Sequence, residues 1–386
     1  MLKWHKIYTS WIAKIPYLNR KHKLAGILRP WAFRSFDLSG YDVVICSSSA
    51  ESKQVAMGKW RKSFMEWQND RMTGQKDRET CETVNLWNCK SEWPQVIVYC
   101  HTPTRYYWSH AKEYEDMMEF GILNPLVKAV FRLVKGWMQR LDYEAAQKVD
   151  FFIANSENTR ERIKKYYDRE SEVIYPGVSI PLIRGTQGVC SDDSETNPPT
   201  PLIRGTLELN YHSSDYPAIR PSDYYLWLGR CIPYKRFDLL VDAFNANGKK
   251  LILCTATDTP LFRELKAKSK PNIEWRFRIS DEEKYELMTH AKAFLFPPEE
   301  DFGLVPVEAM MLWTPVIAYG KWGALESVIE WETGVFFTPQ TPEALNGAIK
   351  RFENMNFDPL KIQEHAGKFS KEAFQKKMVD FVNSKI

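Results

Sequence analysis

Short apolar runs that alternate with amphipathic segments constrain this chain most strongly. In its second half the apolar runs are 224–229, 250–254, 273–277, 293–296 and 315–319. Helical patterns lie between them, at 237–245, 260–269, 281–291 and 304–312. Because neighbouring parallel strands must be joined by a crossover, usually a helix, this order predicts a doubly wound parallel sheet.

The first half repeats the alternation less regularly. Four apolar runs end in small or polar residues, as buried parallel strands do: 41–47, 96–101, 151–156 and 172–176. Helical patterns occupy 123–148 and 156–167. A chain of 386 residues can bury two ordinary cores. The fold class expected is therefore α/β, with two doubly wound, Rossmann-like domains.

Two stretches interrupt the alternation. Residues 56–93 are polar, rich in Trp and Lys, and have no strand pattern, so a loop or a solvated helical insertion is expected there. The hexapeptide Pro-Leu-Ile-Arg-Gly-Thr occurs at 181–186 and again at 201–206, which predicts a duplicated, disordered linker. The predicted organisation is a first domain at 1–178, a linker at 179–222, a second domain at 223–362 and C-terminal helices at 363–386.

The composition excludes several classes of protein. A hydrophobic share of 44% and a charged share of 26% are those of a soluble globular protein. The sequence has no run of eighteen apolar residues, so no transmembrane helix is expected, and no signal peptide is visible. The seven cysteines are scattered without a Cys-x-x-Cys pair, which argues against a zinc site or a disulfide framework. A reducing, cytoplasmic setting is expected.

The first 34 residues are basic and aromatic. One interpretation is peripheral attachment to an anionic membrane surface, where each basic residue adds about 1 kcal/mol. The other is a solvated basic face. Nucleic acid is not an expected partner, because no nucleic-acid-binding motif accompanies the patch. Its cations are Lys3, Lys6, Lys14, Arg20, Lys21, Lys23, Arg29 and Arg34, interleaved with Trp4, Trp11, Tyr17, Trp31 and Phe33.

Residues 293–308 form the strongest candidate site. An apolar strand ends in an acidic turn that contains Glu300, a glycine then opens a helix, and Glu308 follows on that helix. The first N–H groups of a helix lack partners and the helix dipole is positive there, so this place suits an anion. An acid on each side suits a ligand that has many hydroxyls and also carries phosphate, which describes a nucleotide sugar.

Two cations follow the first strand of the second domain. Arg230 and Lys235 lie in the segment Gly229-Arg-Cys-Ile-Pro-Tyr-Lys-Arg. Ligands of open α/β sheets bind outside the carboxyl ends of the strands, so this pair can bind a diphosphate as its negative charge grows. The alternative is a solvated basic turn.

These motifs resemble a known family in order and spacing. Gly229-Arg230, Pro233-Tyr-Lys235-Arg, Glu300-Asp-Phe-Gly303-Leu-Val-Pro-Val-Glu308-Ala and Pro315-Val-Ile-Ala are similar to the donor domain of family 4 retaining glycosyltransferases, which have the GT-B fold. Tyr99-Cys-His101-Thr-Pro and Ala154-Asn-Ser-Glu-Asn-Thr-Arg160 resemble the same family, especially its bacterial polysaccharide mannosyl- and glucosyltransferases. The resemblance covers roughly 30–55, 96–178 and 223–353.

The resemblance implies roles for matching positions. Arg230 and Lys235 would bind the donor's diphosphate, and Glu308 would accept hydrogen bonds from the ribose. Glu300 would contact hydroxyls of the transferred sugar, and His101 would reach its anomeric region. The backbone amides expected to face the sugar or phosphate are those of Phe302, Gly303, Leu304 and Val305. Arg278 and Ile279 are expected near the base.

The activity implied is retaining transfer of a hexose from a GDP- or UDP-linked donor. The acceptor would be a saccharide or a lipid-linked molecule in surface polysaccharide assembly, such as that of lipopolysaccharide. The family implies no metal and no cofactor beyond the nucleotide-sugar substrate. The catalytic residues would be His101, Arg230, Lys235 and Glu300, brought together by domain closure in the cytoplasm or at the inner face of the membrane.

The chain also departs from the family. Members begin with a strand, a Gly-rich turn and a helix before the region that matches Ile7-Tyr-Thr-Ser, so we expect the first domain to lack that strand. Trp313, Trp322 and Phe277 stand where glycine is usual, and a bulky side chain there is expected to prevent a positive φ. The second hypothesis is therefore a truncated, inactive GT-B-like protein that binds a nucleotide or a partner. A dinucleotide oxidoreductase is not favoured, because no Gly-x-Gly-x-x-Gly turn follows a strand.

Overall fold

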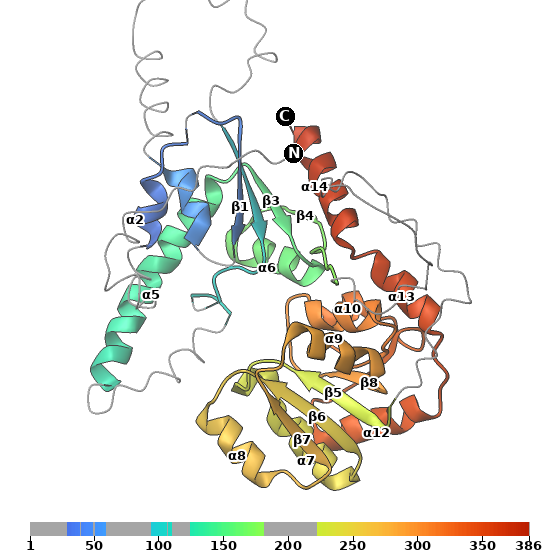
Figure 1. Cartoon of the computed structure of the whole chain (residues 1–386). Helices are drawn as coiled ribbons and strands as arrows, with labels where there is room; N and C mark the ends of the chain where they lie inside the picture. Colours follow the sequence, from blue (N-terminus) through green and yellow to red (C-terminus); the bar gives the residue numbers. More distant parts are fainter. Residues whose placement is uncertain are drawn as a thin grey trace, which may run out of the picture. The chain divides into compact units, whose positions relative to one another are not determined.

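The computed structural model describes residues 29–38, 40–48, 51–58, 94–105, 107–109, 124–180 and 222–385. The chain divides into two compact units, Met1–Tyr175 and Pro176–Ile386. Each unit is built on a parallel sheet with helices packed against it (Figure 1). Within these described ranges, none of the helices combines the length and apolarity that crossing a bilayer requires.

Unit 2 has a six-stranded sheet in the order β10-β9-β8-β5-β6-β7, and all its pairings are parallel. Strand order reverses between β5 and β8, which are neighbours in the sheet although two strands separate them in sequence. Such a reversal is where open α/β sheets bind ligands. The strands are β5 Tyr224–Leu228, β6 Lys250–Thr255, β7 Ile273–Phe277, β8 Ala293–Phe296, β9 Val316–Tyr319 and β10 Gly334–Phe337.

Helices cover both faces of this sheet (Figure 1). On one face lie α7 Phe237–Asn247, α8 Pro260–Lys268 and α12 Pro342–Glu353. On the other lie α9 Asp281–His290, α10 Leu304–Met311 and the short α11 Ala324–Ser327. The chain ends in α13 Pro359–Gly367 and α14 Lys371–Lys385. Side-chain oxygens of Thr259, Ser280, Thr341 and Asp358 accept backbone N–H bonds at four of the helix starts, which accounts for where these helices begin.

An aromatic cluster fills the centre of unit 2. Trp227 on β5 is fully buried, and its ring centroid lies 5.9 Å from that of Phe237, 5.6 Å from Phe294 and 5.8 Å from Phe296. Burying a large apolar side chain contributes roughly 1.5–3 kcal/mol, and close aromatic pairs add to this. The cluster joins β5, β8 and α7, so it fixes the two strands whose loops carry the predicted site residues.

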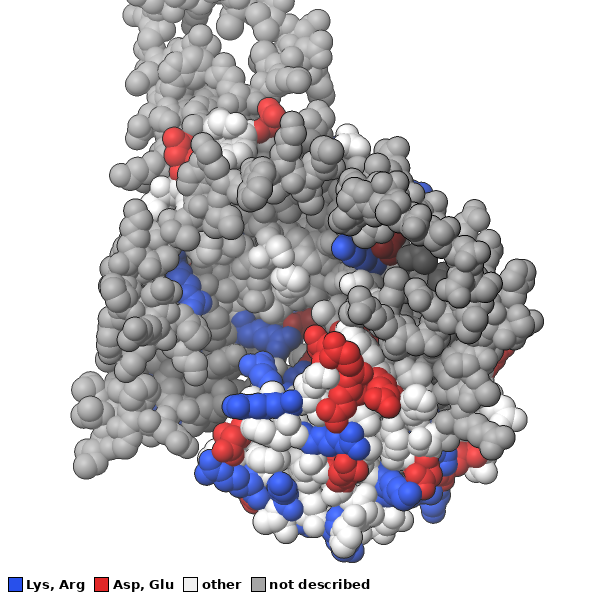
Figure 2. Space-filling model, viewed as in Figure 1, with Lys and Arg blue, Asp and Glu red and all other residues white. Residues whose placement is uncertain are grey.

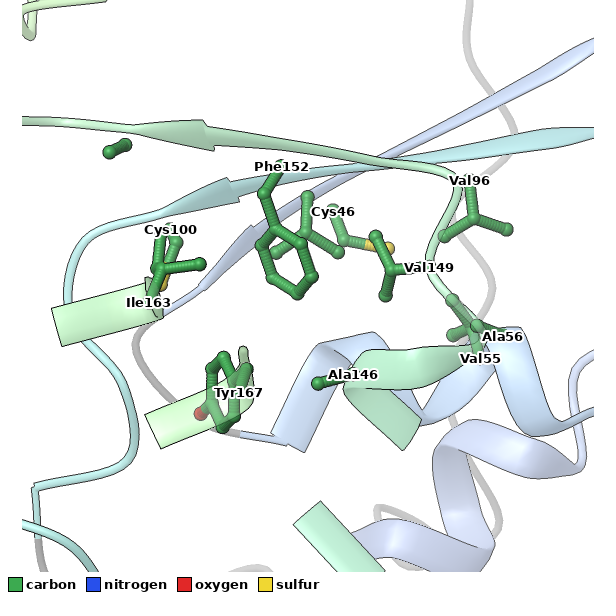
Figure 3. Close-up of a cluster of buried hydrophobic side chains, with 12 residues drawn as sticks. Cys46, Val55, Ala56, Val96, Cys100, Ala146, Val149, Phe152, Ile163 and Tyr167 are labelled. Atoms are coloured by element: carbon green, nitrogen blue, oxygen red, sulfur yellow. The ribbon is translucent and has the colours of Figure 1, made fainter. Parts of the chain in front are cut away.

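Unit 1 has a four-stranded parallel sheet in sequence order, with β1 Val43–Ser48, β2 Gln95–Cys100, β3 Phe151–Ala154 and β4 Glu172–Val173. Its helices are α2 Arg29–Arg34, the 3-10 helix η3 Glu51–Met57, α5 Asn124–Gln147 and α6 Glu157–Tyr167. One face of the sheet packs on η3, α5 and α6 through a cluster of buried side chains that includes Cys46, Val98, Val149, Phe152 and Tyr167 (Figure 3).

The predicted strands and helices are confirmed wherever the structure describes them, with ends shifted by a few residues. The sequence did not predict β10 or α12. Several predictions lie outside the described residues: the basic segment before α2, the strand expected to be missing near Met1, the insertion beyond residue 58 and the linker between 181 and 221.

The expectation that bulky residues prevent a positive φ is wrong. Trp313 has φ 61° and Trp322 has φ 54°, so both turns keep the left-handed conformation that glycine usually supplies. After Phe277 it is the next residue, Arg278, that takes φ 55°. Left-handed backbone costs a non-glycine residue roughly 1–2 kcal/mol, which the surrounding packing of unit 2 must offset.

Candidate functional site

Lys235 and Glu300 meet where the strand order of unit 2 reverses. Lys235 ends the 3-10 turn η5, Pro233–Lys235, which follows β5, and Glu300 lies on the loop that follows β8. The Lys235 ammonium group forms a hydrogen-bonded ion pair with Glu300 Oε1. The two side chains are 14% and 18% exposed, so the pair is screened from bulk water but still accessible.

Aromatic rings surround the Lys235 ammonium group. It lies 5.5 Å from the ring centroid of Tyr234 and 5.9 Å from that of Trp227, and the faces of aromatic rings attract a cation. Arg230 Nη2 donates to the hydroxyl of Tyr234 at 3.3 Å. Tyr234 therefore links the two cations that were predicted to bind a diphosphate, although Arg230 is exposed and Lys235 is not.

Helix α10 begins beside this pair without a side-chain cap. Its N-cap is Gly303, with φ 82°, and the first helical residues are Leu304 and Val305. Because Pro306 has no N–H, the free donors at this helix start come from the residues just before it. A Cβ on Gly303 would lie 2.8 Å from the Phe296 ring, so both φ and space favour glycine here. The predicted amides therefore lie at an uncapped helix N-terminus.

The turn between β9 and α11 contacts the loop that contains Glu300. Gly323 N donates to the backbone oxygen of Glu300 at 3.1 Å. A Cβ on Gly323 would lie 2.3 Å from the Cα of Phe302, so no other residue fits without moving the loop. Trp322, with its positive φ, directly precedes this contact. The glycine that the loop requires is thus present, one position after the tryptophan.

Glu308 has a cation partner that the sequence did not predict. Its Oε2 lies 2.6 Å from Lys284 Nζ on α9, and both side chains are 19% exposed. The same oxygen is buried and has no hydrogen bond of ordinary geometry, so the contact is an ion pair with unused acceptor capacity. The first turn of α9 contains three acids, Asp281, Glu282 and Glu283. On the face drawn in Figure 2, acidic side chains gather in one patch among basic ones. A ribose hydroxyl would have to displace a neighbouring group to reach this buried oxygen, although it would not have to break a hydrogen bond there.

The residues predicted near the base lie at the end of β7. Arg278 N donates to the backbone oxygen of Thr255 at 3.0 Å, and its guanidinium lies 5.0 Å from the Phe277 ring centroid. Phe277 stacks on Phe262 of α8 at 5.8 Å. An open hollow of about 600 Å³ lies between α8 and this strand end, lined in part by both rings and by Asp258. Ile279 follows Arg278 and is partly buried.

Three threonines close the turn that lacks glycine after β6. The hydroxyls of Thr255 and Thr257 accept from Cys231 N, at 3.2 and 2.8 Å, and the Thr259 hydroxyl donates to Cys231 O at 2.9 Å. Hydroxyl groups therefore hold the loop next to Arg230 in place. From the sequence, only the absence of glycine from this turn was noted.

His101 lies in unit 1, at the carboxyl end of β2. Its Nε2 is 3.0 Å from Ser47 Oγ at the end of β1, and its ring meets Tyr99 edge-on at 5.2 Å. The backbone oxygen of His101 accepts from Thr159 Oγ1 at 3.3 Å. The side chain is exposed, and its chemistry in this unit is that of a polar group held at a strand end.

A buried polar network supports the loop that follows His101. Asp142 of α5 lies 2.7 Å from Lys53 Nζ, and the two side chains are 2% and 4% exposed. The Asp142 carboxylate also accepts from Thr104 Oγ1 at 3.1 Å, Trp108 Nε1 at 2.9 Å and the Tyr167 hydroxyl at 2.8 Å. No sequence pattern indicated this network, because its members come from four separate segments.

The residues that the structure describes include neither a cluster of metal ligands nor an exposed, reactive thiol. No group of three or more His, Cys, Asp or Glu residues is placed there to hold a metal ion. The cysteines that are described, Cys46, Cys100, Cys231 and Cys254, are buried and form no disulfide with one another. Burial raises the pKa of the Cys46 and Cys254 thiols to about 12 and that of Cys231 to about 11, which suppresses the reactive thiolate.

A family model matches most of unit 2. The model of "Glycosyl transferases group 1" matches residues 216–375. Alpha-1,3/1,6-mannosyltransferase ALG2 of Dictyostelium discoideum is 23% identical over 294 residues, which are 69% of this chain and 63% of that protein. The mouse protein of the same name is 24% identical over 305 residues, covering 75% and 68%. The chain thus spans less than two thirds of the Dictyostelium relative.

Solved structures agree on the fold. Anabaena Alr3699/HepE, in complex with UDP-glucose, has a TM-score of 0.55 at 15% identity, over 98% of this chain and 85% of its own. Sucrose-phosphate synthase from Thermosynechococcus elongatus has a TM-score of 0.53 at 18% identity, over 89% and 74%. Residues 216–375 are therefore similar to glycosyl transferases group 1, and the chain has the GT-B fold.

Proposed function

We propose that this chain is a retaining, metal-independent glycosyltransferase that moves a hexose from a nucleotide sugar to a saccharide or lipid-linked acceptor in surface polysaccharide assembly. The observation that carries the proposal is the Lys235–Glu300 ion pair, held beside the uncapped start of α10 where the strand order reverses. The pair joins a group suited to phosphate with one suited to sugar hydroxyls.

Donor binding exchanges the partners of this pair. The diphosphate takes the place of Glu300 beside Lys235, and the released carboxylate accepts hydrogen bonds from hydroxyls of the sugar. Arg230 and the amides of Gly303 and Leu304 supply the remaining positive charge. These groups act as fixed cations and dipoles in the role that a metal ion has in other enzymes, so no metal is part of the proposal.

The chemical step exchanges one bond at the anomeric carbon. The acceptor oxygen bonds to that carbon on the face that the diphosphate leaves, and the carbon–phosphate oxygen bond breaks. The acceptor proton passes to the departing phosphate oxygen, so no protein base is needed. Lys235 and Arg230 compensate the charge that develops on the leaving diphosphate, while His101 is assigned to the anomeric region.

The similar proteins support two classes of sugar donor. The mannosyltransferases similar to this chain support a mannosyl donor, for which GDP is the carrier proposed. The similarity to HepE, solved with UDP-glucose, supports a UDP-linked hexose. The place of action proposed is the cytoplasm, with peripheral attachment at the inner face of the membrane through the basic and aromatic residues at 3–34.

A second candidate is an inactive GT-B-like protein that binds a nucleotide or a partner. The observation that favours it is that two predicted ligand groups are already neutralised: Lys235 by Glu300 and Glu308 by Lys284. Such a protein would bind a nucleotide sugar without transfer or hydrolysis.

Transfer of labelled hexose from GDP-mannose, UDP-glucose and UDP-galactose, with a chelator present, tests the activity. The proposal predicts label in a saccharide or lipid acceptor, with the donor's anomeric configuration kept. Lys235→Ala and Glu308→Ala should each abolish turnover and leave the fold intact. Lys250→Ala is the matched control, because its ion pair with Asp223 is 65% and 69% exposed. Binding with neither transfer nor hydrolysis would establish the second candidate instead.

A further inference from the structure

The turn that follows β10 reaches across the edge of the sheet to the candidate site. In the strand order β10-β9-β8-β5, two strands separate β10 from β5. The side chain of Gln340, in the turn between β10 and α12, nevertheless bonds to the loops that follow β8 and β5. The three loops therefore meet at the carboxyl edge of the sheet, where open α/β sheets bind their ligands.

The Gln340 amide uses both its donor and its acceptor. Its Nε2 donates to the backbone oxygen of Pro297 at 2.8 Å, and Pro297 begins the loop that contains Glu300. Its Oε1 accepts from Arg236 Nη1, and Arg236 directly follows Lys235. Because a carbonyl only accepts and a guanidinium only donates, one orientation of the amide satisfies both partners. We name these two hydrogen bonds the Gln340 bridge.

Rigid elements hold both ends of the Gln340 bridge. Arg236 ends η5 and begins α7 with φ 55°, and its Nε donates to Asp238 Oδ1 at 3.2 Å. Thr341 directly follows Gln340 and caps α12, where its hydroxyl accepts from Ala344 N. A side chain supported in this way can keep two loops in register, which lowers the cost of ordering them when a ligand binds.

We propose that Gln340 is a positioning residue for the donor, which keeps the loops of Lys235 and Glu300 in place while their ion pair opens. The inference rests on the proposed function, because it assumes that a diphosphate separates the pair. The Gln340 bridge involves neither of the two paired side chains. It therefore persists when Lys235 and Glu300 exchange partners, and the Lys235 ammonium group stays where the diphosphate meets it.

A double-mutant cycle tests this role, with UDP and GDP as the probes and calorimetric titration as the measurement. Gln340→Met keeps the length of the side chain and removes both hydrogen bonds. It should weaken nucleotide binding about fivefold, a typical coupling between groups that act together. In the Lys235→Met background it should have little further effect, because the group that it positions is already absent. Equal weakening in both backgrounds, or none in the wild type, would overturn the proposal.

Asn346 of α12 provides the matched control. Its amide also donates once and accepts once: Nδ2 donates to Ala243 O at 3.1 Å, and Oδ1 accepts from Asn247 Nδ2 at 2.7 Å. Both partners lie on α7, away from the loops of the candidate site. Asn346→Leu should therefore leave nucleotide affinity unchanged. If it weakened binding as much as Gln340→Met does, loss of stability would explain both effects and the positioning role would be wrong.

The same titrations separate this inference from the proposed function. The inference alone fails if the wild type binds a nucleotide and loses affinity through Lys235→Met but keeps it through Gln340→Met. A wild-type chain that binds neither UDP nor GDP overturns the proposed function, and the positioning role with it.

Discussion

Each unit contains a lysine–carboxylate pair near the carboxyl ends of its strands, and the two pairs differ in burial. Lys53 and Asp142 in unit 1 are 4% and 2% exposed, and three further side-chain donors satisfy the Asp142 carboxylate. Lys235 and Glu300 in unit 2 are 14% and 18% exposed, and Glu300 has Lys235 as its recorded side-chain partner. The Asp142 carboxylate has its hydrogen bonds satisfied within the protein, whereas the Glu300 carboxylate can still accept hydrogen bonds from a ligand.

The difference teaches how to separate a structural ion pair from a binding group. A buried pair is stable only when all its hydrogen-bonding capacity is used, so removing one partner leaves an uncompensated charge. The Lys235–Glu300 pair keeps partial contact with solvent, so water or a ligand can take the place of either partner when the pair opens. The energy of the second pair is therefore available for exchange with a phosphate or a hydroxyl.

The largest effect is expected at the buried pair. Asp142→Ala should lower the free energy of unfolding by about 3–5 kcal/mol, because Lys53 is left charged and buried among groups that have lost their acceptor. Urea denaturation followed by circular dichroism measures it. Glu144→Ala is the control, since its pair with Arg140 is 43% and 80% exposed and should contribute less than about 1 kcal/mol. If Asp142→Ala lowered the free energy of unfolding no more than Glu144→Ala does, the buried pair would not differ from an exposed one and the comparison would fail.

Loss of the Lys235–Glu300 pair should affect the rate of transfer more than the stability of the fold. Lys235→Met should lower kcat at least about 100-fold, as expected when one group that stabilises developing charge is removed. Its free energy of unfolding should change less than that of Asp142→Ala, because water still reaches the Glu300 carboxylate that is left. Steady-state transfer rates and denaturation curves on the same preparation measure both. A variant that unfolds easily but keeps its rate would place Lys235 with the structural pairs.

Glu353 provides an intermediate case in which pH is the probe. Burial opposes its ionisation, but hydrogen bonds from Lys249, Lys292 and Tyr225 outweigh burial and lower its pKa from 4.5 to about 2. Its folded pKa is below the unfolded value, so its contribution to stability is present above pH 4.5 and is lost as pH falls toward 2. Glu353→Gln should remove that part of the acid sensitivity. Thermal melts across this pH range measure it, and an unchanged slope would contradict the assignment.

The smallest effect is expected at a fully exposed pair. Lys164 and Asp168 are 54% and 76% exposed, and Asp168 ends α6 with φ 51°. Asp168→Gly should raise the free energy of unfolding by about 0.5–1 kcal/mol, because relief of the left-handed strain exceeds the value of the pair. Chemical denaturation of this variant beside Asp168→Ala separates the two terms, since alanine loses the pair and keeps the strain. A less stable glycine variant would show that exposed pairs matter more here than we state.

Local signals predicted most of the fold. The alternation of apolar runs with helical patterns marks β5 to β9 and the helices between them, because each of these elements has its own periodicity. The strand β10 and helix α12 were not predicted. The backbone conformation of Trp313 and Trp322 was predicted wrongly. Sequence rules take account of the strain of a positive φ, but they do not show the packing that stabilises it.

The sequence predicted which loops form the candidate site, but not how their side chains pair. Strand ends and a helix start placed Arg230, Lys235, Glu300 and the amides after Phe302 at one edge of the sheet. The pairings of Lys235 with Glu300 and of Lys284 with Glu308 could not be predicted, because each joins elements distant in sequence. The same holds for the Asp142 network, whose members are recognisable only once α5, η3 and α6 are packed together.

Calorimetric titration with UDP and with GDP, in the presence of a chelator, tests the central claim most directly. The wild-type chain should bind at least one of them. Lys235→Met should bind it at least about tenfold more weakly, because a charged contact with phosphate is lost. Glu300→Gln should bind it as tightly or more tightly, because the carboxylate no longer competes for Lys235. Wild-type protein that binds neither nucleotide, or a Lys235→Met variant with unchanged affinity, would contradict the claim that this pair opens to receive a diphosphate.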